Sequence, residues 1–340
     1  MLNNNIYGID LGTCNLKVFC KGTGKVLNEK NTVAIVGKDT LYAIGDEAYA
    51  MYEKAPESIQ VSFPVVSGVI ADYDNMQTML YELLEAHTKS KLKGAEFIVA
   101  VPTDITEVEK RAFYDLFQKS DFRPKNVLLC EKPIADGVGL GLDVNAPTGY
   151  MIVDIGADTT EISVISLGGL VISELLHFGG RRLDDAIISH MKRTYNLVIG
   201  RKTACLLKEE IGCALPDAEE KTMMAVGRDV VSGLPIEMEI TTSMVYEAIK
   251  DCLESICNAI KRILEKTPPE LARDIIHSGI YLTGGSSKIS CLSDLFTQIT
   301  NIRVNTCENP EECAVRGLVK IVSDAKYAKL TFNVKSMILK

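Results

Sequence analysis

The sequence lacks several features that would direct it to well-known classes of protein. Its ten cysteines include no Cys-x-x-Cys pair, and its four histidines are scattered, which argues against a zinc site or a disulfide framework and favours free thiols in a reducing compartment. The net charge of −8 does not predict a nucleic-acid-binding surface. No apolar run approaches the roughly 18 residues of a membrane span, and the first residues do not resemble a signal peptide. These absences favour a cytoplasmic protein.

The composition is that of an ordinary globular protein. Hydrophobic residues make up 46% of the chain and charged residues 24%, which is close to the average for folded domains. A chain of 340 residues is long enough for two domains of usual size, each with an ample core.

The stretch 6–19, IYGIDLGTCNLKVF, consists of two short apolar segments on either side of a tight turn. The turn is Gly12-Thr13-Cys14-Asn15, and Asp10 lies at the end of the first predicted strand. Successive backbone N–H groups in such a turn form a concavity that binds anions, and a neighbouring carboxylate can hold Mg²⁺ through water. The pattern suits a phosphate-and-metal site, although a turn of this kind between strands is more often an ordinary hairpin.

A second stretch repeats this pattern. Residues 150–165, YMIVDIGADTTEISVI, place Asp154 and Gly156 between two apolar segments. We therefore expect two similar halves that face a shared cleft and grip the phosphates of a nucleotide from both sides. A looser third stretch, 280–287, runs from a strand into Gly284-Gly285, where a backbone can approach a base or ribose closely.

Strands and helices alternate along the rest of the chain. Thr106 and Glu109 have the spacing of a capping box at the start of a helix, and the glycine-rich segment 134–142 predicts a helix that packs closely against another backbone. Apolar residues at helical spacing predict further helices over 75–86, 183–195, 202–211 and 244–266. This alternation predicts an α/β fold with mixed sheets.

Four longer stretches of the sequence, together with the two aspartate-glycine turns, indicate a family resemblance. They read GVIADYD, DDAIISHMKRTYNL, GRDVVSGLP and EKTPPELARDII, and they occupy residues 68–74, 184–197, 227–235 and 265–276. Together the motifs resemble the actin-like ATPase superfamily and, within it, the bacterial rod-shape-determining MreB/Mbl family. The resemblance runs from Tyr7 to about Ser323.

The resemblance implies a duplicated actin-like (ribonuclease H-like) fold with two α/β lobes around a nucleotide cleft. The first lobe would comprise residues 1–145 and 318–340 with a small subdomain at about 31–63, and the second lobe 146–317 with a subdomain at about 180–240. It also implies binding of ATP or ADP with Mg²⁺, and assembly into filaments that organise cell shape and cell-wall synthesis in the cytoplasm, at or near the inner face of the membrane. The implied partners are other copies of the chain, a related actin-like paralogue and membrane proteins of cell-wall morphogenesis.

The resemblance further implies a set of binding residues. The first phosphate loop would be Asp10, Gly12, Thr13, Cys14 and Asn15. The second would be Gly156, Ala157, Asp158, Thr159 and Thr160, with Asp10 and Asp154 near the metal through water. Adenosine would lie against Gly284, Gly285, Ser286 and Ser287, with Lys208 near the base and Cys205 at the position of the family's ribose-contacting glutamate.

Two departures from the family pattern concern the hydrolytic step. Lys132, which follows Glu131, replaces the glutamate thought to orient the attacking water, and a protonated lysine accepts no hydrogen bond. General-base help is worth about 10²–10⁴ in rate. Asp158 replaces a glycine of the second loop, and a carboxylate ~4 Å from a phosphate charge costs about 4 kcal/mol per unit charge at an effective dielectric constant near 20. We therefore expect nucleotide binding with weak or absent hydrolysis.

These substitutions leave alternatives open. Lys132 and Asp158 can neutralise one another across the cleft, or Asp158 can turn outward to solvent while Lys132 binds phosphate. A fully competent filament ATPase is an alternative if Glu131 orients the water. A small-molecule kinase of the same superfamily is another, although no spacing indicates its substrate pocket or base, and a chaperone-type ATPase would need a separate substrate-binding domain.

The loop 89–95, KSKLKGA, corresponds to one through which family members contact membranes. Leu92 is its only large apolar residue, and Lys89, Lys91 and Lys93 would each favour an anionic surface by ~1 kcal/mol near a membrane. We expect at most a weak peripheral membrane contact, and a solvated loop tip is the simpler interpretation.

Overall fold

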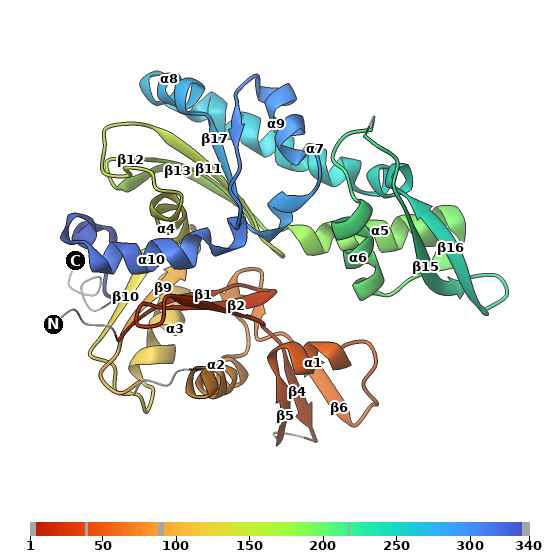
Figure 1. Ribbon diagram of the computed structural model, residues 1–340, viewed down its shortest axis with the longest axis horizontal. Helices are drawn as coiled ribbons and strands as arrows, with labels where there is room; N and C mark the ends of the chain where they lie inside the picture. The colour runs from red at the N-terminus through yellow and green to blue at the C-terminus, as the bar shows by residue number, and fades with distance from the viewer. Residues whose placement is uncertain (1–4, 38–39, 88–91, 217, 335–340) are drawn as a thin grey trace. The chain divides into compact units, whose positions relative to one another are not determined.

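The computed structural model describes residues 5–37, 40–87, 92–216 and 218–334 (Figure 1). Its contacts divide the chain into two compact units. Unit 1 comprises Met1–Thr148, Ile165–Leu175 and Glu311–Lys340, and unit 2 comprises Gly149–Val164 and Leu176–Pro310. The lobe and subdomain boundaries expected from the sequence stay a prediction.

The main sheet of unit 1 is a mixed five-stranded sheet in the order β10-β9-β1-β2-β3. Its strands are β1 (Ile6–Leu11), β2 (Asn15–Cys20), β3 (Lys25–Lys30), β9 (Glu96–Val101) and β10 (Asn126–Glu131). β1 and β2 form the first predicted hairpin, in which Asp10 lies opposite Lys17 and Leu11 opposite Leu16. β9 and β10 run parallel to β1 and are largely buried, as expected for parallel strands covered on both faces.

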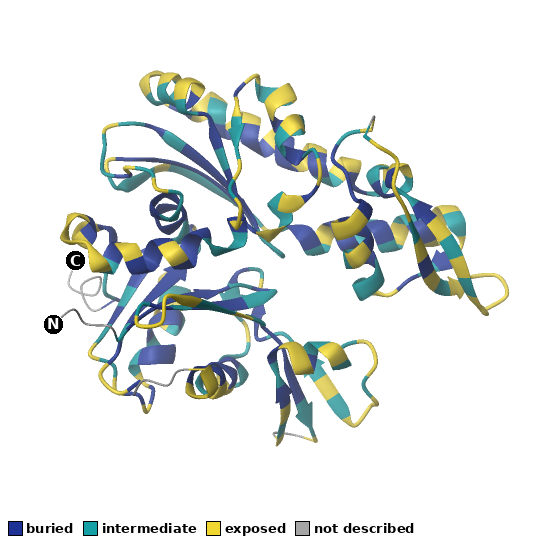
Figure 2. Cartoon of the chain, viewed as in Figure 1, coloured by how far each residue is buried: buried dark blue, intermediate teal, exposed yellow. Residues whose placement is uncertain are grey.

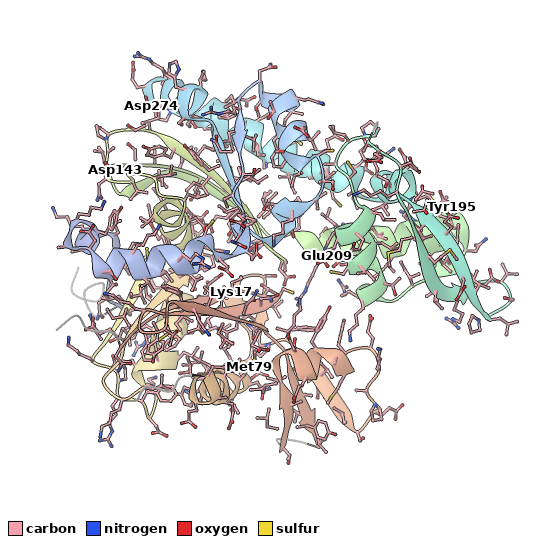
Figure 3. All side chains as sticks on the ribbon, in the orientation of Figure 1. Lys17, Met79, Asp143, Tyr195, Glu209 and Asp274 are labelled. Atoms are coloured by element: carbon pink, nitrogen blue, oxygen red, sulfur yellow. The ribbon has the colours of Figure 1, made fainter. Side chains whose placement is uncertain are left out.

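Helices cover both faces of this sheet (Figure 1). On one face lie α2 (Tyr73–His87) and α3 (Glu107–Gln118), and on the other α4 (Lys132–Gly139) and α10 (Cys313–Ser323). Met79 of α2 belongs to the core that also contains Ile9 and Phe97 (Figures 2 and 3). The capping box predicted for α3 is confirmed, because Thr106 Oγ1 accepts from Glu109 N while Glu109 Oε2 accepts from Thr106 N.

α4 and α10 pack with their backbones in contact. A Cβ atom at Gly317 would overlap the carbonyl oxygen of Ala135, and one at Gly139 would overlap the carbonyl oxygen of Cys313. The close packing predicted for the glycine-rich helix is therefore confirmed, and its partner is α10, for which the sequence analysis predicted no helix. Because α4 begins at Lys132, this contact fixes the position of the residue that departs from the family pattern.

The last described residues of the chain also belong to unit 1. After the 3₁₀ helix η3 (Ala325–Leu330), Phe332 forms an antiparallel bridge with Leu129 of β10, and each residue donates its N–H to the other's carbonyl oxygen at 2.9 Å. Val334 is buried in the core of unit 1. The C-terminal segment thus pairs with the edge strand of the sheet.

The smaller elements of unit 1 follow the first hairpin. They are a three-stranded sheet in the order β5-β4-β6, a two-stranded ribbon and one helix. Their bounds are β4 (Val33–Val36), β5 (Thr40–Ile44), α1 (Gly45–Met51), β6 (Ile59–Ser62), β7 (Val65–Val66) and β8 (Val69–Ile70).

The second five-stranded sheet has the order β13-β12-β11-β17-β18. Its strands are β11 (Tyr150–Ile155), β12 (Thr160–Ser166), β13 (Gly169–Leu176), β17 (Ile280–Thr283) and β18 (Val304–Asn305). A three-stranded sheet contains β14 (Leu197–Val198), β15 (Thr222–Asp229) and β16 (Pro235–Thr241). The second predicted hairpin is confirmed as β11 and β12, whereas the hairpin of β15 and β16 was not predicted.

Seven further helical segments complete the described chain. They are α5 (Gly180–Tyr195), α6 (Arg201–Ile211), α7 (Thr242–Lys266), α8 (Pro269–Ser278), α9 (Leu292–Thr300) and two short 3₁₀ helices, η1 (Gly285–Lys288) and η2 (Pro310–Glu312). The apolar stripe of α7 is buried as predicted, and the helix ends before Thr267-Pro268-Pro269.

The structure corrects one expectation about the loop 89–95. Lys89 and Lys91 lie outside the described residues, but Leu92 is 7% exposed and belongs to the core of unit 1. Its side chain is therefore committed to packing and is not available for insertion into a lipid surface. Lys93 is exposed.

The α4–α10 contact makes a stability prediction. Gly317→Ala should lower the thermal unfolding midpoint of the full chain, because the added methyl group has to displace the carbonyl of Ala135. Such overpacking costs about 1–3 kcal/mol and occasionally more, which exceeds the ~1 kcal/mol gained in helix propensity.

Gly169→Ala on β13 is the control for this variant. Its Cβ atom would meet only Ser166 O, at 4.0 Å, so the midpoint should stay close to that of the wild type. A Gly317→Ala protein as stable as Gly169→Ala would show that the two helix backbones are not in contact.

Candidate functional site

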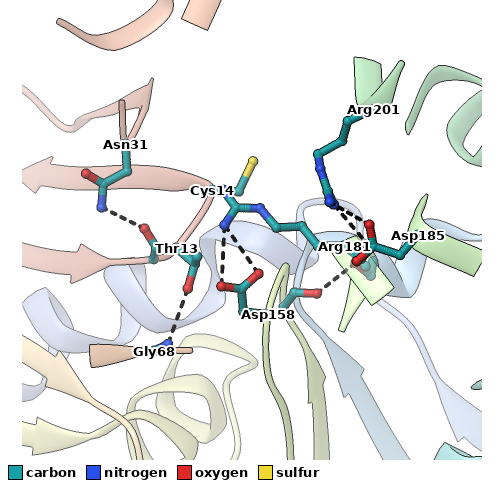
Figure 4. A network of polar contacts seen from close by, with 12 residues as sticks. Thr13, Cys14, Asn31, Gly68, Asp158, Arg181, Asp185 and Arg201 are labelled. Carbon is teal, nitrogen blue, oxygen red and sulfur yellow. Dashed lines mark hydrogen bonds and ion pairs between the residues drawn. The ribbon is translucent and has the colours of Figure 1, made fainter. Parts of the chain in front are cut away.

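The first predicted phosphate loop is the turn between β1 and β2. Gly12 is needed there, because a Cβ atom would lie 2.7 Å from Asn15 O. Asn31 Nδ2 donates to Gly12 O at 2.9 Å, and Gly68 N donates to Thr13 Oγ1 at 3.3 Å (Figure 4). Neither supporting residue was singled out from the sequence as part of the site, although Gly68 begins the GVIADYD string.

The side chain of Lys30 contacts the last two residues of the same turn. Its Nζ lies 3.5 Å from Cys14 Sγ and 3.4 Å from Asn15 Oδ1, and Asn15 Nδ2 donates to Asn28 Oδ1 at 2.7 Å. The predicted loop residues are therefore fixed by side chains of β3 and its neighbourhood.

Asp10 is buried beside this turn and is paired with a lysine. Its Oδ2 lies 3.3 Å from Lys17 Nζ (Lys17 is labelled in Figure 3), and the two side chains are only 7% and 11% exposed. Burial raises the pKa of Asp10, but the charges of Lys17 and Lys132 outweigh burial and lower the pKa below its ordinary value. The carboxylate is therefore ionised at neutral pH.

Lys17 was not predicted as a partner of Asp10, although the sequence carries the signal for it. A four-residue turn between Leu11 and Leu16 places residue 17 directly opposite residue 10 in an antiparallel hairpin. Side chains of opposite residues share one face of the sheet, so a basic residue at this position had to meet the aspartate.

Lys132 and Glu131 lie where β10 gives way to α4. Glu131 is the N-cap residue and makes no capping bond through its side chain, and Lys132 is the first helical residue. A cation at a helix N-terminus opposes the helix dipole, and the nearby charge of Asp10 offsets that cost. Burial raises the pKa of Glu131, against the effect of Lys110 and with the help of Asp104.

The second predicted phosphate loop is the turn between β11 and β12. Gly156 N donates to Thr159 O at 2.8 Å and closes the turn. The first residues of α5 then hold it from outside, because Gly180 N donates to Gly156 O at 2.9 Å and Arg181 N donates to Ala157 O at 2.7 Å. Thr160, at the start of β12, donates through Oγ1 to Phe178 O at 3.0 Å. The loop is thus fixed against the N-terminus of α5, whose first two N–H groups are taken up by carbonyl oxygens of the loop.

Asp158 on this loop pairs with Arg181, a residue that the sequence analysis did not consider. Arg181 Nη1 lies 3.3 and 3.4 Å from the two carboxylate oxygens (Figure 4). The Asp158 side chain is 13% exposed, so the interpretation that it turns outward to solvent is wrong. Lys132 belongs to unit 1 and Asp158 to unit 2, and their mutual pairing stays a hypothesis.

The predicted adenosine residues and Lys208 meet the second loop inside unit 2. Ser286 Oγ donates to Gly156 O at 2.8 Å, and Lys208 Nζ donates to Gly180 O at 3.0 Å while pairing with Asp184 at 2.7 Å. Gly180 lies between them, since a Cβ atom there would be 3.2 Å from Lys208 Nζ and would overlap Ser286 Oγ. Residues from four elements therefore converge at one corner of unit 2, and binding of adenosine there stays a prediction.

Of the other predicted residues, Gly284 and Ser287 lie in the turn after β17, and Cys205 lies on α6. Gly284 has a φ of +85°, and a Cβ atom there would overlap Asp154 Oδ1, so glycine is required beside that buried aspartate. Ser287 Oγ donates to Gly284 O at 2.6 Å and stabilises the same turn. Cys205 Sγ lies 3.4 Å from Glu209 Oε1, and burial chiefly raises its pKa to about 12.

Asp10 of unit 1 and Asp154 of unit 2 each have the chemistry to hold a magnesium ion through water, and their sharing of one ion stays a prediction. Mg²⁺ in nucleotide sites keeps several waters and uses one or two carboxylates together with the phosphates. Asp10 is ionised and Asp154 is buried at the end of β11. Among the described residues, no group of three or more His, Cys, Asp or Glu side chains is placed to hold a metal by itself, so a metal here would depend on the phosphates.

The chain matches one protein family over nearly its whole length. The family description "MreB/Mbl protein" matches residues 4–330. The cell shape-determining protein Mbl of Bacillus subtilis is 37% identical over 312 residues, which cover 91% of this chain and 93% of Mbl. The chain belongs to the MreB/Mbl family.

Other members of the MreB/Mbl family give the same result. The cell shape-determining protein MreB of Escherichia coli is 38% identical over 324 residues, covering 93% of this chain and 92% of that protein. The crystal structure of MreB5 of Spiroplasma citri bound to AMPPNP has a TM-score of 0.89 and 32% identity, covering 95% of this chain and 96% of that one. The predicted family and the predicted actin-like α/β fold are confirmed.

The buried Asp10–Lys17 pair makes a pH prediction for the nucleotide-free chain. Because the pKa of Asp10 is lowered in the folded state, its stabilising contribution is present above its ordinary value near 3.8 and is lost as the pH falls through the folded pKa. Lys17→Met should destabilise the chain at pH 7 by about 3 kcal/mol, since it leaves a buried carboxylate without its nearest cation. Urea unfolding should show that the free energy of unfolding lost in Lys17→Met becomes smaller when Asp10 is protonated.

The double variant Asp10→Asn/Lys17→Met tests the same pair without a buried charge. It should recover most of the stability that Lys17→Met loses at pH 7. A Lys17→Met deficit that is the same at neutral and acidic pH would indicate lost packing of the lysine stem rather than a lost ion pair.

Proposed function

We propose that this member of the MreB/Mbl family is an actin-like cytoskeletal protein. It binds ATP or ADP and assembles with copies of itself into filaments that organise cell shape and cell-wall synthesis. The observation that carries the proposal is the pair of hairpins β1-β2 and β11-β12, each with a buried aspartate ahead of a tight glycine turn. The related MreB5 of S. citri, whose crystal structures contain AMPPNP and ADP, supports a nucleotide as the ligand.

In this proposal each turn takes part of one polyphosphate. The first turn, held by Asn31 and Gly68, and the second turn, held by the start of α5, present backbone N–H groups to phosphate oxygens. Mg²⁺, bound through water to Asp10 and Asp154, would neutralise phosphate charge. The corner of Gly180, Lys208 and Ser286 would lie on the nucleoside side.

Weak hydrolysis is the second part of the proposal. Lys132 occupies the position from which the family's glutamate would orient the attacking water, and it donates hydrogen bonds but accepts none. The alternative of a competent ATPase has one observation in its favour, because burial raises the pKa of neighbouring Glu131 towards the range of a useful general base. The described residues provide no comparable observation for a small-molecule kinase.

Lys132→Glu tests the hydrolytic part. Restoring an acceptor at this position should raise phosphate release from ATP by about tenfold or more, towards the 10²–10⁴ that general-base help supplies. Phosphate release and pelleting of the purified full chain would be measured with ATP, with ADP and without nucleotide, and electron microscopy would show whether filaments form.

Lys132→Gln is the matched control, since it removes the same positive charge without adding a base. Equal phosphate release from both variants would attribute the gain to the lost lysine charge alone. Rapid release by the wild type, abolished by Glu131→Gln, would establish the competent ATPase instead. Failure to form filaments under every nucleotide condition would contradict the polymer.

We also propose a cytoplasmic location with weak peripheral attraction to the inner face of the membrane. Among the described residues, no helix combines the length and apolar character needed to cross a membrane. Since Leu92 is buried, attraction would depend on the charges of Lys89, Lys91 and Lys93. A related paralogue and membrane proteins of cell-wall morphogenesis are the further partners that we propose.

Vesicle co-sedimentation tests the membrane proposal. The chain should pellet with anionic vesicles, not with neutral ones, and the bound fraction should fall as salt screens the charges. The triple variant Lys89→Gln/Lys91→Gln/Lys93→Gln should lose this binding. Binding that resists salt, or that persists in the triple variant, would point to an apolar contact elsewhere.

A further inference from the structure

The second phosphate loop carries two opposite charges side by side. Asp158 lies on the loop itself, and Arg181 is the second residue of α5, whose N–H donates to Ala157 O of the same loop at 2.7 Å. The guanidinium and carboxylate are 3.3 Å apart, and their side chains are 22% and 13% exposed. At such low exposure the two charges are only partly screened by solvent.

The main chain of Arg181 is hydrogen-bonded through both its N–H and its carbonyl oxygen. Its N–H is bound to the loop, and Arg201, which pairs with Asp185 of α5, donates through Nη1 to Arg181 O at 3.5 Å (Figure 4). In contrast, both contacts with Asp158 use the single atom Nη1, at 3.3 and 3.4 Å. Charge-assisted pairs are usually shorter, at about 2.7–2.9 Å, and arginine–carboxylate pairs frequently use two parallel N–H bonds.

This geometry allows another anion to compete for the guanidinium. Arginine carries five N–H donors in a planar fork that matches phosphate oxygens. A terminal phosphate brings more negative charge than one carboxylate, and it would lie on the loop where Asp158 alone repels it. The side chain of Arg181 can turn from Asp158 towards phosphate while its main chain stays bound to Ala157 and Arg201.

We propose that Arg181 is a specificity-determining residue that makes the second loop sense the phosphate charge of its ligand. The inference rests on the nucleotide site proposed above. Without phosphates the guanidinium pairs with Asp158, and with a nucleoside di- or triphosphate it turns to the phosphate oxygens and offsets the carboxylate's repulsion. Affinity therefore rises with the number of phosphates, although the loop carries an aspartate.

Isothermal titration of the full chain with ATP, ADP and adenosine tests this inference. Arg181→Gln should weaken ATP binding by about tenfold or more, the effect of one hydrogen-bonded charge pair. It should weaken ADP binding less and leave adenosine binding unchanged. Asp158→Asn, which removes repulsion, should strengthen ATP binding, and the double variant should lie closer to the wild type than Arg181→Gln does.

Arg182→Gln is the matched control. It removes the same charge one residue further along α5, from an exposed side chain. Exposed charges contribute little, so the ATP affinity of this variant should stay within about threefold of the wild type. Thermal unfolding of each variant would confirm that it is folded under the titration conditions.

Several outcomes would overturn the inference. Equal losses of ATP, ADP and adenosine binding in Arg181→Gln would mean that the arginine only supports the loop. An equal loss in Arg182→Gln would indicate a general charge effect, and weaker ATP binding by Asp158→Asn would show that the carboxylate is not repulsive. A wild type that binds none of the three ligands would overturn the nucleotide site as well as the inference, so the two failures are distinguishable.

Discussion

Close approach of main-chain atoms shapes both candidate phosphate loops, and side-chain bonds support the first of them. In unit 1, Gly12 turns so closely on Asn15 that no side chain fits between them, and in unit 2 the carbonyl of Gly156 receives the N–H of Gly180. A loop fixed in this way keeps its N–H groups oriented without paying side-chain entropy when a ligand arrives. The glycines are therefore structural requirements of the site, whatever charge their neighbours carry.

The charged side chains around these loops lie next to side chains of opposite charge. Lys17 and Lys132 both act on Asp10, and Arg181 accompanies Asp158. In each case a partly or fully buried charge that would be unfavourable alone has an opposite charge nearby, and the attraction between the two offsets the cost of burial. The consequence is a family scaffold in which a lysine or an arginine accompanies an aspartate at each of the two candidate loops.

The sequence revealed those parts of the fold that depend on local signals. The Thr106 capping box, the two hairpins and the apolar stripe of α7 each involve residues close together in the chain. By contrast, the partner of the glycine-rich helix is α10, nearly two hundred residues away, and the burial of Leu92 depends on the whole core of unit 1. The loop residues of the site were identifiable by motif and resemblance, but Arg181 was not. Its contact with Asp158 forms only because α5, which follows β12 and β13 in the chain, begins beside the loop.

The bridge between Phe332 and Leu129 has a consequence for how copies of the chain can join. An edge strand normally offers unpaired N–H and C=O groups to any neighbour that can add a strand. Here the chain's own C-terminal segment occupies those groups at Leu129 and anchors itself through Val334. Strand addition by another molecule at that point of β10 is blocked, so this part of the sheet edge is not available for edge-to-edge pairing.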